Sequence, residues 1–408
     1  MRRRKGSLTP CVTSNIMNMR MGVLSTTAVQ NQFSIAQLER MQLSKKKEFE
    51  QTFSTSICSM DLEDVEERYL LSGIGDGGLF IHDLYAVNGS SRLTIKTICK
   101  IPTGSTHAHK YGIQKVQWYP FDTGMFTSSS LDEKLKVWDT NTLKPAGTFT
   151  IQGGITCHHM SPVAVKHCLI AACSRSPVIK MFDLKKGSAV HELRGHREPA
   201  IVCCWSPVNE FFLATGGCDG KLLLWDVRCT KTCLLAFDRK GTNMKPTHKD
   251  LSRAHEGYVN GISFMKSGLE VMSLGTDNQL RVWSMVTGLQ KSVCFNRIPT
   301  ERSQHTEMAI ANNSRPEFIF VPSQGKIFML NTRTGALVKT LLGHFNSVNC
   351  CVFREKDQEL YSGGRDRTIL VWSAIPELDE ETANSDEKCT TTTTVSAMQD
   401  AWSDDEGT

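Results

Sequence analysis

The sequence lacks the features that mark secreted, membrane-spanning or zinc-binding proteins. It shows no secretory signal pattern, and no apolar run is long enough to cross a bilayer. Its 15 cysteines form no paired C-x-x-C motifs, and Cys229 and Cys233 have no second ligand pair at zinc-site spacing. We therefore expect free thiols, no bound metal and a reducing compartment, the cytosol or the nucleus.

Motifs that carry enzyme chemistry are also missing. The sequence has no glycine-rich loop of the kind that cradles phosphates. It has no Ser/His/Asp set and no carboxylate pair outside one repeated pattern. We therefore expect a protein without catalytic residues, cofactor or metal.

Charge is unevenly placed along the chain, although the net charge is only +5. The first fifty residues are basic, and Arg2–Lys5 is either a nuclear import signal or a solvated terminus. Residues 376–408 are acidic and of low complexity, so we expect a disordered tail. Trp402 in this tail is a candidate anchor for a partner.

A repeated unit organises the sequence between these ends. Its clearest copy runs from Gly195 to Arg228 and contains three apolar strands separated by turns. Four polar side chains in it suit a buried relay of hydrogen bonds, in which carboxylate, imidazole, hydroxyl and indole follow one another: Asp219, His196, Thr215 and Trp225. We interpret this relay as structural.

The same spacing recurs along the chain. A Ser or Thr precedes an Asp by four residues, and a strand-ending residue lies six residues beyond the Asp, for example at Ser362, Asp366 and Trp372. Five units keep this register, and two degenerate units end near Phe182 and Leu330. Seven units of roughly 40–45 residues predict an all-β propeller of seven four-stranded blades. We place it at residues 46–375.

The last unit stops after its third strand, at Trp372, so its blade needs an outer strand from elsewhere. The alternating stretch at about residues 46–53, which contains KEFEQTF, is the predicted closing strand. The extension at residues 1–45 contains a predicted helix from Ser34 to Ser44, with Ser34 and Gln37 as a capping box.

The predicted helix carries a narrow apolar stripe of Ile35, Leu38 and Met41. Either this stripe packs on the chain's own propeller, or it docks in a groove of another protein. Strand directions predict that the helix and Arg228 lie on one face of the ring, where we expect a constitutive partner. The opposite face, which carries the opening histidines, is left for a second partner.

An insertion from Asp238 to Arg253 is rich in Lys and Arg. It is either a solvated loop or a surface for phosphates or an acidic protein. It has no interleaved aromatic residues, so we expect no sequence-specific nucleic-acid binding.

The seven units resemble WD40 repeats. Trp225-Asp226-Val227-Arg228, with Asp219 upstream, is similar to a box found in WD40 substrate receptors of cullin-4 ubiquitin ligases. The strings QWYPFDTGMFTSSSLDEKLKVWDTNTL, HHMSPVAVKHCL and DAWSDDEG resemble the Cockayne syndrome A family. The resemblance covers roughly residues 57–408.

This resemblance implies a nuclear, non-catalytic substrate-recognition subunit of a cullin-4 RING E3 ubiquitin ligase. The implied pathway is transcription-coupled nucleotide-excision repair at stalled RNA polymerase II. The implied partners are the damaged-DNA-binding adaptor subunit, cullin-4 and the RING protein, and the implied clients are the Cockayne syndrome B ATPase and the RNA polymerase II complex. The implied adaptor-binding residues are Asp226, Arg228, Ile35, Leu38 and Met41.

Two other functions are compatible with the residues. One is a non-catalytic WD40 scaffold in another nuclear complex, with Arg228 as an ordinary edge residue. The other is a nucleic-acid binder that uses the loop from Asp238 to Arg253.

Overall fold

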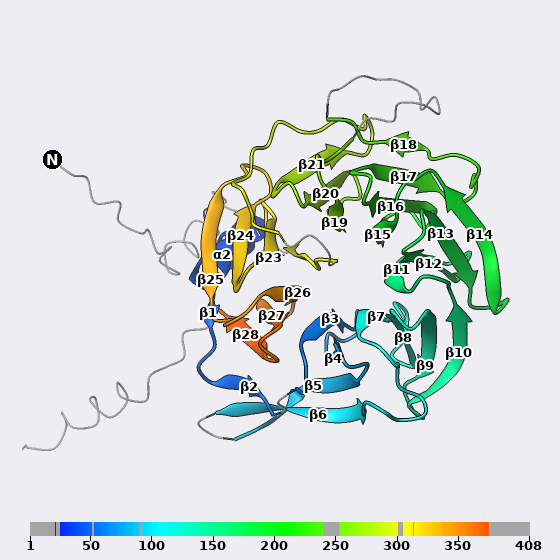
Figure 1. The fold of residues 1–408 in the computed structure, drawn as a ribbon. Coiled ribbons are helices and arrows are strands. Elements are labelled where there is room, and N and C mark those ends of the chain that lie inside the picture. The colour runs from blue at the N-terminus through cyan, green and yellow to red at the C-terminus, as the bar shows by residue number, and fades with distance from the viewer. Residues whose placement is uncertain are drawn as a thin grey trace, which may run out of the picture. The chain divides into compact units, whose positions relative to one another are not determined.

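Seven small β-sheets are arranged as blades around a central axis, as a computed structural model shows (Figure 1). The structure describes residues 21, 25–50, 53–89, 92–239, 253–300, 305–312 and 314–374. The predicted tail disorder, Trp402, the basic N-terminus and most of the loop from Asp238 to Arg253 lie outside these residues. The predicted seven-bladed propeller is confirmed.

Each blade begins with the strand nearest the axis and continues outward through antiparallel neighbours. The strands of blades 1 to 3 are β3 (Ile57–Leu62), β4 (Tyr69–Ile74), β5 (Leu79–Asn88), β6 (Leu93–Ile101), β7 (Ile113–Trp118), β8 (Met125–Ser130), β9 (Lys134–Asp139), β10 (Lys144–Thr150), β11 (Ile155–Met160), β12 (Leu169–Ser174), β13 (Val178–Asp183) and β14 (Ser188–Arg194).

The strands of blades 4 to 7 are β15 (Ala200–Trp205), β16 (Phe212–Gly217), β17 (Leu222–Asp226), β18 (Leu235–Ala236), β19 (Val259–Phe264), β20 (Glu270–Gly275), β21 (Leu280–Ser284), β22 (Ala309–Ala311), β23 (Phe318–Pro322), β24 (Lys326–Asn331), β25 (Leu337–Leu342), β26 (Val348–Arg354), β27 (Glu359–Gly364) and β28 (Ile369–Ser373). Blade 5 has three named strands, β19 to β21, in the part of the chain that the structure describes.

The core lies between neighbouring blades, because the strands of one blade bury apolar side chains against the next. The cluster around blades 3 to 5 joins Trp205, Trp225 and Trp283, each at most 1% exposed, with the apolar residues of β12 to β20. Burial of a Val, Leu, Ile, Phe or Met side chain contributes about 1.5–3 kcal/mol. Blade-to-blade packing therefore holds the ring together.

The structure corrects the predicted closing strand. Blade 7 is completed by β1 (Gln42–Leu43), in which Leu43 pairs with Trp372. The stretch expected to close the ring forms β2 (Lys47–Phe49) instead, a fifth strand that pairs in parallel with β6 of blade 1. Alternation indicated a strand, but it carried no information on which blade the strand joins.

The N-terminal helix is also longer than predicted. Helix α2 runs from Thr26 to Arg40, and Ser25 is its N-cap because the Ser25 side chain accepts a hydrogen bond from the Ala28 amide. Ser34 lies inside the helix, where its hydroxyl accepts a hydrogen bond from Gln358 Nε2 at 3.0 Å. The predicted capping box at Ser34 and Gln37 is therefore wrong.

Candidate functional site

The polar relay predicted in the repeat is present in blade 4. Asp219 Oδ1 accepts a hydrogen bond from His196 Nδ1 at 3.0 Å. Thr215 Oγ1 lies 2.9 Å from His196 Nε2 and accepts from Trp225 Nε1 at 2.8 Å. All four side chains are buried. The same relay recurs in blades 2, 5 and 7, in the last with His344, Ser362, Asp366 and Trp372.

These relays lie within the blades, and their histidine, hydroxyl and indole groups are buried. They satisfy buried polar groups and fix the turn that begins at each Asp. Their position supports the structural interpretation that the spacing predicted.

The corner after β17 presents a cation that is held on two sides. Arg228 donates two hydrogen bonds to Asp226, from Nε to Oδ1 at 3.0 Å and from Nη2 to Oδ2 at 2.7 Å. Its guanidinium also lies 4.6 Å from the ring centroid of Phe211. The Arg228 side chain is 58% exposed, so it is oriented and accessible at the same time. The hydrogen bonds from Arg228 lower the pKa of Asp226.

Phe211 is a site residue that the sequence did not reveal. It lies in the turn between β15 and β16, immediately before the second strand of its blade. Its position relative to Arg228 depends on blade pairing, in which Val227 donates to the Phe211 carbonyl at 3.0 Å. Repeat spacing predicts this pairing, but it does not predict the stacked contact.

Arg228 and α2 lie on the same face of the ring. Phe211, beneath Arg228, belongs to a turn between the first two strands of a blade, and these turns share one face because the first strands all run in one direction. α2 contacts two turns of the same class, through Asn31 to Arg315 in blade 6 and through Ser34 to Gln358 in blade 7. In Figure 1 α2 lies behind β24 and β25.

The apolar stripe of α2 is used inside the chain. Leu38 and Met41 are 1% and 0% exposed, and both belong to the core cluster of blades 6 and 7 with Phe320 and Trp372. Ile35 is half-buried against the same cluster. Leu38 and Met41 therefore cannot fill a groove of another protein while α2 keeps this position, which corrects the role predicted for them. The alternative interpretation, a helix packed on its own propeller, describes them.

A groove of about 560 Å³ lies between blades 5 and 6. Blade 5 separates Arg228, in blade 4, from blade 6, which α2 contacts. The lining of the groove is mixed in character and includes Leu269, Glu317 and Arg333. Arg333 follows Leu330-Asn331-Thr332 and so holds the same repeat position as Arg228. That equivalence was visible in the sequence and was missed.

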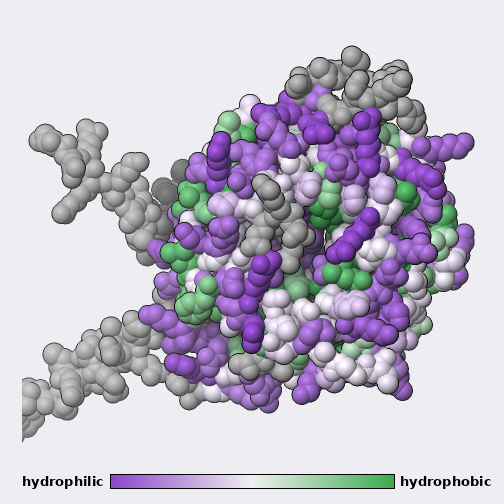
Figure 2. Space-filling model, viewed as in Figure 1, coloured by the Kyte–Doolittle hydropathy of each residue, from purple (hydrophilic) through white to green (hydrophobic). Residues whose placement is uncertain are grey.

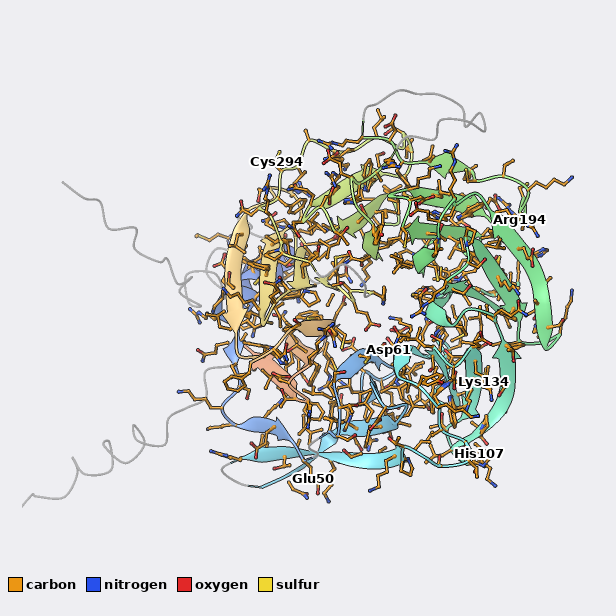
Figure 3. All side chains as sticks on the ribbon, viewed as in Figure 1. Glu50, Asp61, His107, Lys134, Arg194 and Cys294 are labelled. Carbon is orange, nitrogen blue, oxygen red and sulfur yellow. The ribbon has the colours of Figure 1, made fainter. Side chains whose placement is uncertain are left out.

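The centre of the ring contains a buried ionic cluster. Glu307 accepts a hydrogen bond from Ser59 Oγ at 2.6 Å and lies 3.0 Å from Lys115 Nζ, so it connects blades 1 and 2. Asp61 lies toward the centre of the ring (Figure 3), and burial raises its pKa to about 8. This cluster ties blades together and leaves its charges compensated.

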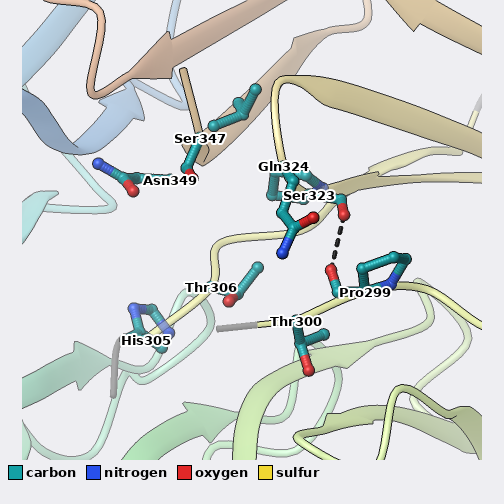
Figure 4. Close-up of a pocket in the computed structure, with 10 residues that line it drawn as sticks. Pro299, Thr300, His305, Thr306, Ser323, Gln324, Ser347 and Asn349 are labelled. Atoms are coloured by element: carbon teal, nitrogen blue, oxygen red, sulfur yellow. Dashed lines mark hydrogen bonds between the residues drawn. The ribbon is translucent and has the colours of Figure 1, made fainter. Parts of the chain in front are cut away.

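A second pocket, on the face opposite Arg228, is too small for a substrate. It encloses about 20 Å³, which is room for a single water molecule. Figure 4 shows its polar lining, in which Ser323 donates a hydrogen bond to the Pro299 carbonyl at 2.6 Å. Within the described ranges, no group of three His, Cys, Asp or Glu residues is placed to hold a metal. No described helix has the length and apolar character needed to cross a membrane.

Comparisons with known proteins agree with the blade pattern. The WD domain, G-beta repeat model matches residues 100–139, 187–226, 245–284 and 335–373. The chain is 29% identical to the WD repeat-containing protein ATCSA-1 of Arabidopsis thaliana, over 94% of this chain and 98% of that protein.

Other relatives share a smaller part of the chain. Radiation-sensitive protein 28 of Saccharomyces cerevisiae is 29% identical, over 44% of this chain and 39% of that protein. Pre-mRNA-processing factor 17 of Homo sapiens is 24% identical, over 49% of this chain and 31% of that protein.

Proposed function

We propose that this WD40-repeat propeller protein is the substrate-recognition subunit of a cullin-4 RING E3 ubiquitin ligase. The proposal starts from its resemblance to the Cockayne syndrome A members of the WD40 proteins, which its sequence strings predicted. The protein's place would be the nucleus, in transcription-coupled nucleotide-excision repair at stalled RNA polymerase II. Similarity along almost the whole of the plant relative supports this proposal, as does the name of the yeast relative, a radiation-sensitive protein.

The observation that carries the proposal is the orientation of Arg228. The Asp226 carboxylate and the Phe211 ring hold its exposed guanidinium, so little conformational freedom is lost when a partner binds. Arginine is one of the residues enriched among those that contribute most of the binding energy at protein interfaces. We propose that Asp226 and Arg228 contact the damaged-DNA-binding adaptor, which links the propeller to cullin-4 and the RING protein.

In this arrangement the propeller contributes no active site of its own. It holds a client, the Cockayne syndrome B ATPase or the RNA polymerase II complex, on the face opposite Arg228. The ligase then delivers ubiquitin to a nearby lysine because tethering raises the local concentration of the client.

Substitution of Arg228 tests the proposal. We expect Arg228→Ala to weaken binding of the purified adaptor by at least tenfold, because an oriented interface arginine contributes about 2 kcal/mol or more. Titration calorimetry with the whole chain measures this effect. Arg194→Ala, which removes an exposed arginine from an outer strand, is the matched control and should bind like the wild type.

Deletion of residues 1–24 is a second arm, because it removes the basic N-terminus and leaves α2 and β1 in place. Adaptor binding that stays at the wild-type level in both Arg228→Ala and this deletion would contradict the proposal.

The pre-mRNA-processing relative favours the second candidate, a scaffold in another nuclear complex. Purification of the wild-type chain from nuclei without adaptor or cullin would support that candidate.

A further inference from the structure

We propose that the turn between β16 and β17 forms a binding site for the phosphate group of a phosphorylated serine or threonine in a partner protein. The site consists of Arg197, Lys221 and Arg253, which we call the cationic site. It lies on the face that carries the opening histidines, opposite Arg228. It therefore goes beyond the proposed function, because it needs neither the adaptor nor the ligase.

Backbone hydrogen bonds bring the three cations to one turn. The Asp219 carboxylate accepts from the amide of Arg197 at 3.0 Å and from the amide of Lys221 at 3.1 Å. The Gly220 carbonyl accepts from the amides of Ala254 and His255, the residues that follow Arg253, each at 3.0 Å. Gly220 has a φ of 71°, a conformation in which glycine is unstrained. These bonds hold the backbone of Arg197, and that of the residues after Arg253, against the turn that carries Lys221.

Lys221 is the unusual member of the site. It is 4% exposed, and its Nζ is buried without a hydrogen-bond partner. The nearby Asp219 does not supply one: its oxygens accept from His196 Nδ1 and from the amides of Arg197 and Lys221, and not from Lys221 Nζ. A buried ammonium without an acceptor is unfavourable until an anion arrives. Burial lowers the pKa of Lys221, and Arg197 and Arg253 lower it further against the opposing effect of Asp219.

The matching lysine of blade 2 behaves differently. Lys134 also follows its turn Asp by two positions, but it is half-exposed at the start of β9. Its neighbour Lys136, which is 5% exposed, donates to the His107 and Ala108 carbonyls and is satisfied. Among the described residues, Lys221 is the one lysine whose buried Nζ has no hydrogen-bond partner, so this feature does not come from the repeat.

The chemistry of the site favours a phosphorylated side chain over a nucleic acid. Arg197 and Arg253 are exposed, and both are near enough to the buried Lys221 for their charges to act on its ammonium. We infer that the three cations together suit a single phosphate dianion. Exposed Glu198 adjoins Arg197 and would repel an extended phosphate backbone, whereas the charge of exposed Glu256 is paired with Arg239 at 2.6 Å. In the view of Figure 2 hydrophilic side chains cover much of the ring, and hydrophobic side chains form smaller patches.

The first test uses inorganic phosphate and the whole chain. We expect saturable binding by titration calorimetry at constant ionic strength, and a rise in Tm of about 2–4 °C near saturation. Lys221→Met should weaken phosphate binding at least tenfold without lowering the Tm of the phosphate-free protein. Lys134→Met is the matched control and should leave phosphate binding unchanged. Equal phosphate binding by wild type and Lys221→Met would overturn the proposal.

The second test identifies the source of the phosphate. We expect acetyl-Gly-phosphoserine-Gly-amide to bind at least tenfold more tightly than the unphosphorylated peptide, and Arg253→Glu to abolish this difference. A 12-base-pair DNA duplex that binds more tightly than the phosphopeptide would overturn the proposal in favour of a nucleic-acid surface.

Failure here is distinguishable from failure of the proposed function. Lys221→Met should bind the adaptor like the wild type, because the cationic site and Arg228 lie on opposite faces. Loss of adaptor binding in Lys221→Met would contradict this placement.

Discussion

At the scale of single residues, burial keeps His82 uncharged. The ring of His82 is 0% exposed and lies between Ser72 Oγ and Thr97 Oγ1, at 2.9 and 3.0 Å. Burial lowers its pKa to about 3. In the unfolded chain the ordinary value is near 6.5, so the unfolded state binds the proton first as the pH falls. The contribution of His82 to stability is therefore present above pH 6.5 and is lost as the pH falls toward 3.

This effect is measurable against a variant that cannot titrate. We expect the stability of the wild type relative to His82→Gln to fall by about 2 kcal/mol between pH 7.5 and 5.0, in urea unfolding.

The contribution of Asp61 to stability changes with pH in the opposite direction. Burial raises the pKa of Asp61 to about 8, so its contribution is lost as the pH rises from about 4 to 8. The wild type should therefore gain stability relative to Asp61→Asn over the same fall in pH. Differences that do not change with pH would contradict both assignments.

At the scale of one element, α2 is part of the propeller core. We expect Leu38→Ala to destabilise the protein by about 2–5 kcal/mol, because the truncated side chain leaves a cavity among the buried residues of blades 6 and 7. Phe33→Ala is the matched control on the same helix, since Phe33 is 58% exposed and should cost less than about 0.5 kcal/mol. Thermal unfolding compares the two, and equal effects would contradict the packing role.

The elements also show how far sequence reasoning reaches. The Ser/Asp/Trp register predicted the blades because it follows from hydrogen bonds within each unit. The start of α2 escaped prediction because residues 26–33 have no apolar periodicity, and contacts such as that of Asn31 with Arg315 support the helix there. Arg228 was predicted as a site residue from its motif. Phe211 and Lys221 were not, because their roles depend on neighbours that only the folded ring supplies.

At the scale of the whole molecule, Glu307 fastens several blades at the axis. Its carboxylate accepts hydrogen bonds from the Ser59 hydroxyl and the Met60 amide in blade 1 and forms an ion pair with Lys115 in blade 2. Its backbone forms hydrogen bonds with the backbone of Asn349 and Cys351 in blade 7. We expect Glu307→Ala to cost about 3–5 kcal/mol, because it leaves Lys115 largely buried and uncompensated. Glu307→Gln combined with Lys115→Met should recover most of this loss.

The control for this prediction is a pair on the surface. Glu270 and Lys291 form an ion pair whose side chains are 29% and 42% exposed, so Glu270→Ala should cost no more than about 1 kcal/mol. Chemical unfolding of Glu307→Ala, of the double variant Glu307→Gln with Lys115→Met, and of Glu270→Ala measures the free energy of unfolding that each loses. A Glu307→Ala cost as small as that of Glu270→Ala would show that the axis does not depend on this carboxylate.

The pairing of β1 with β28 has a consequence for biosynthesis. Leu43 can pair with Trp372 only after the ribosome has synthesised Trp372, some 330 residues later in the chain. The growing chain therefore stays an open arc, with the edge of its newest blade uncovered, until translation is almost finished. We expect chaperones to hold the nascent protein during that interval.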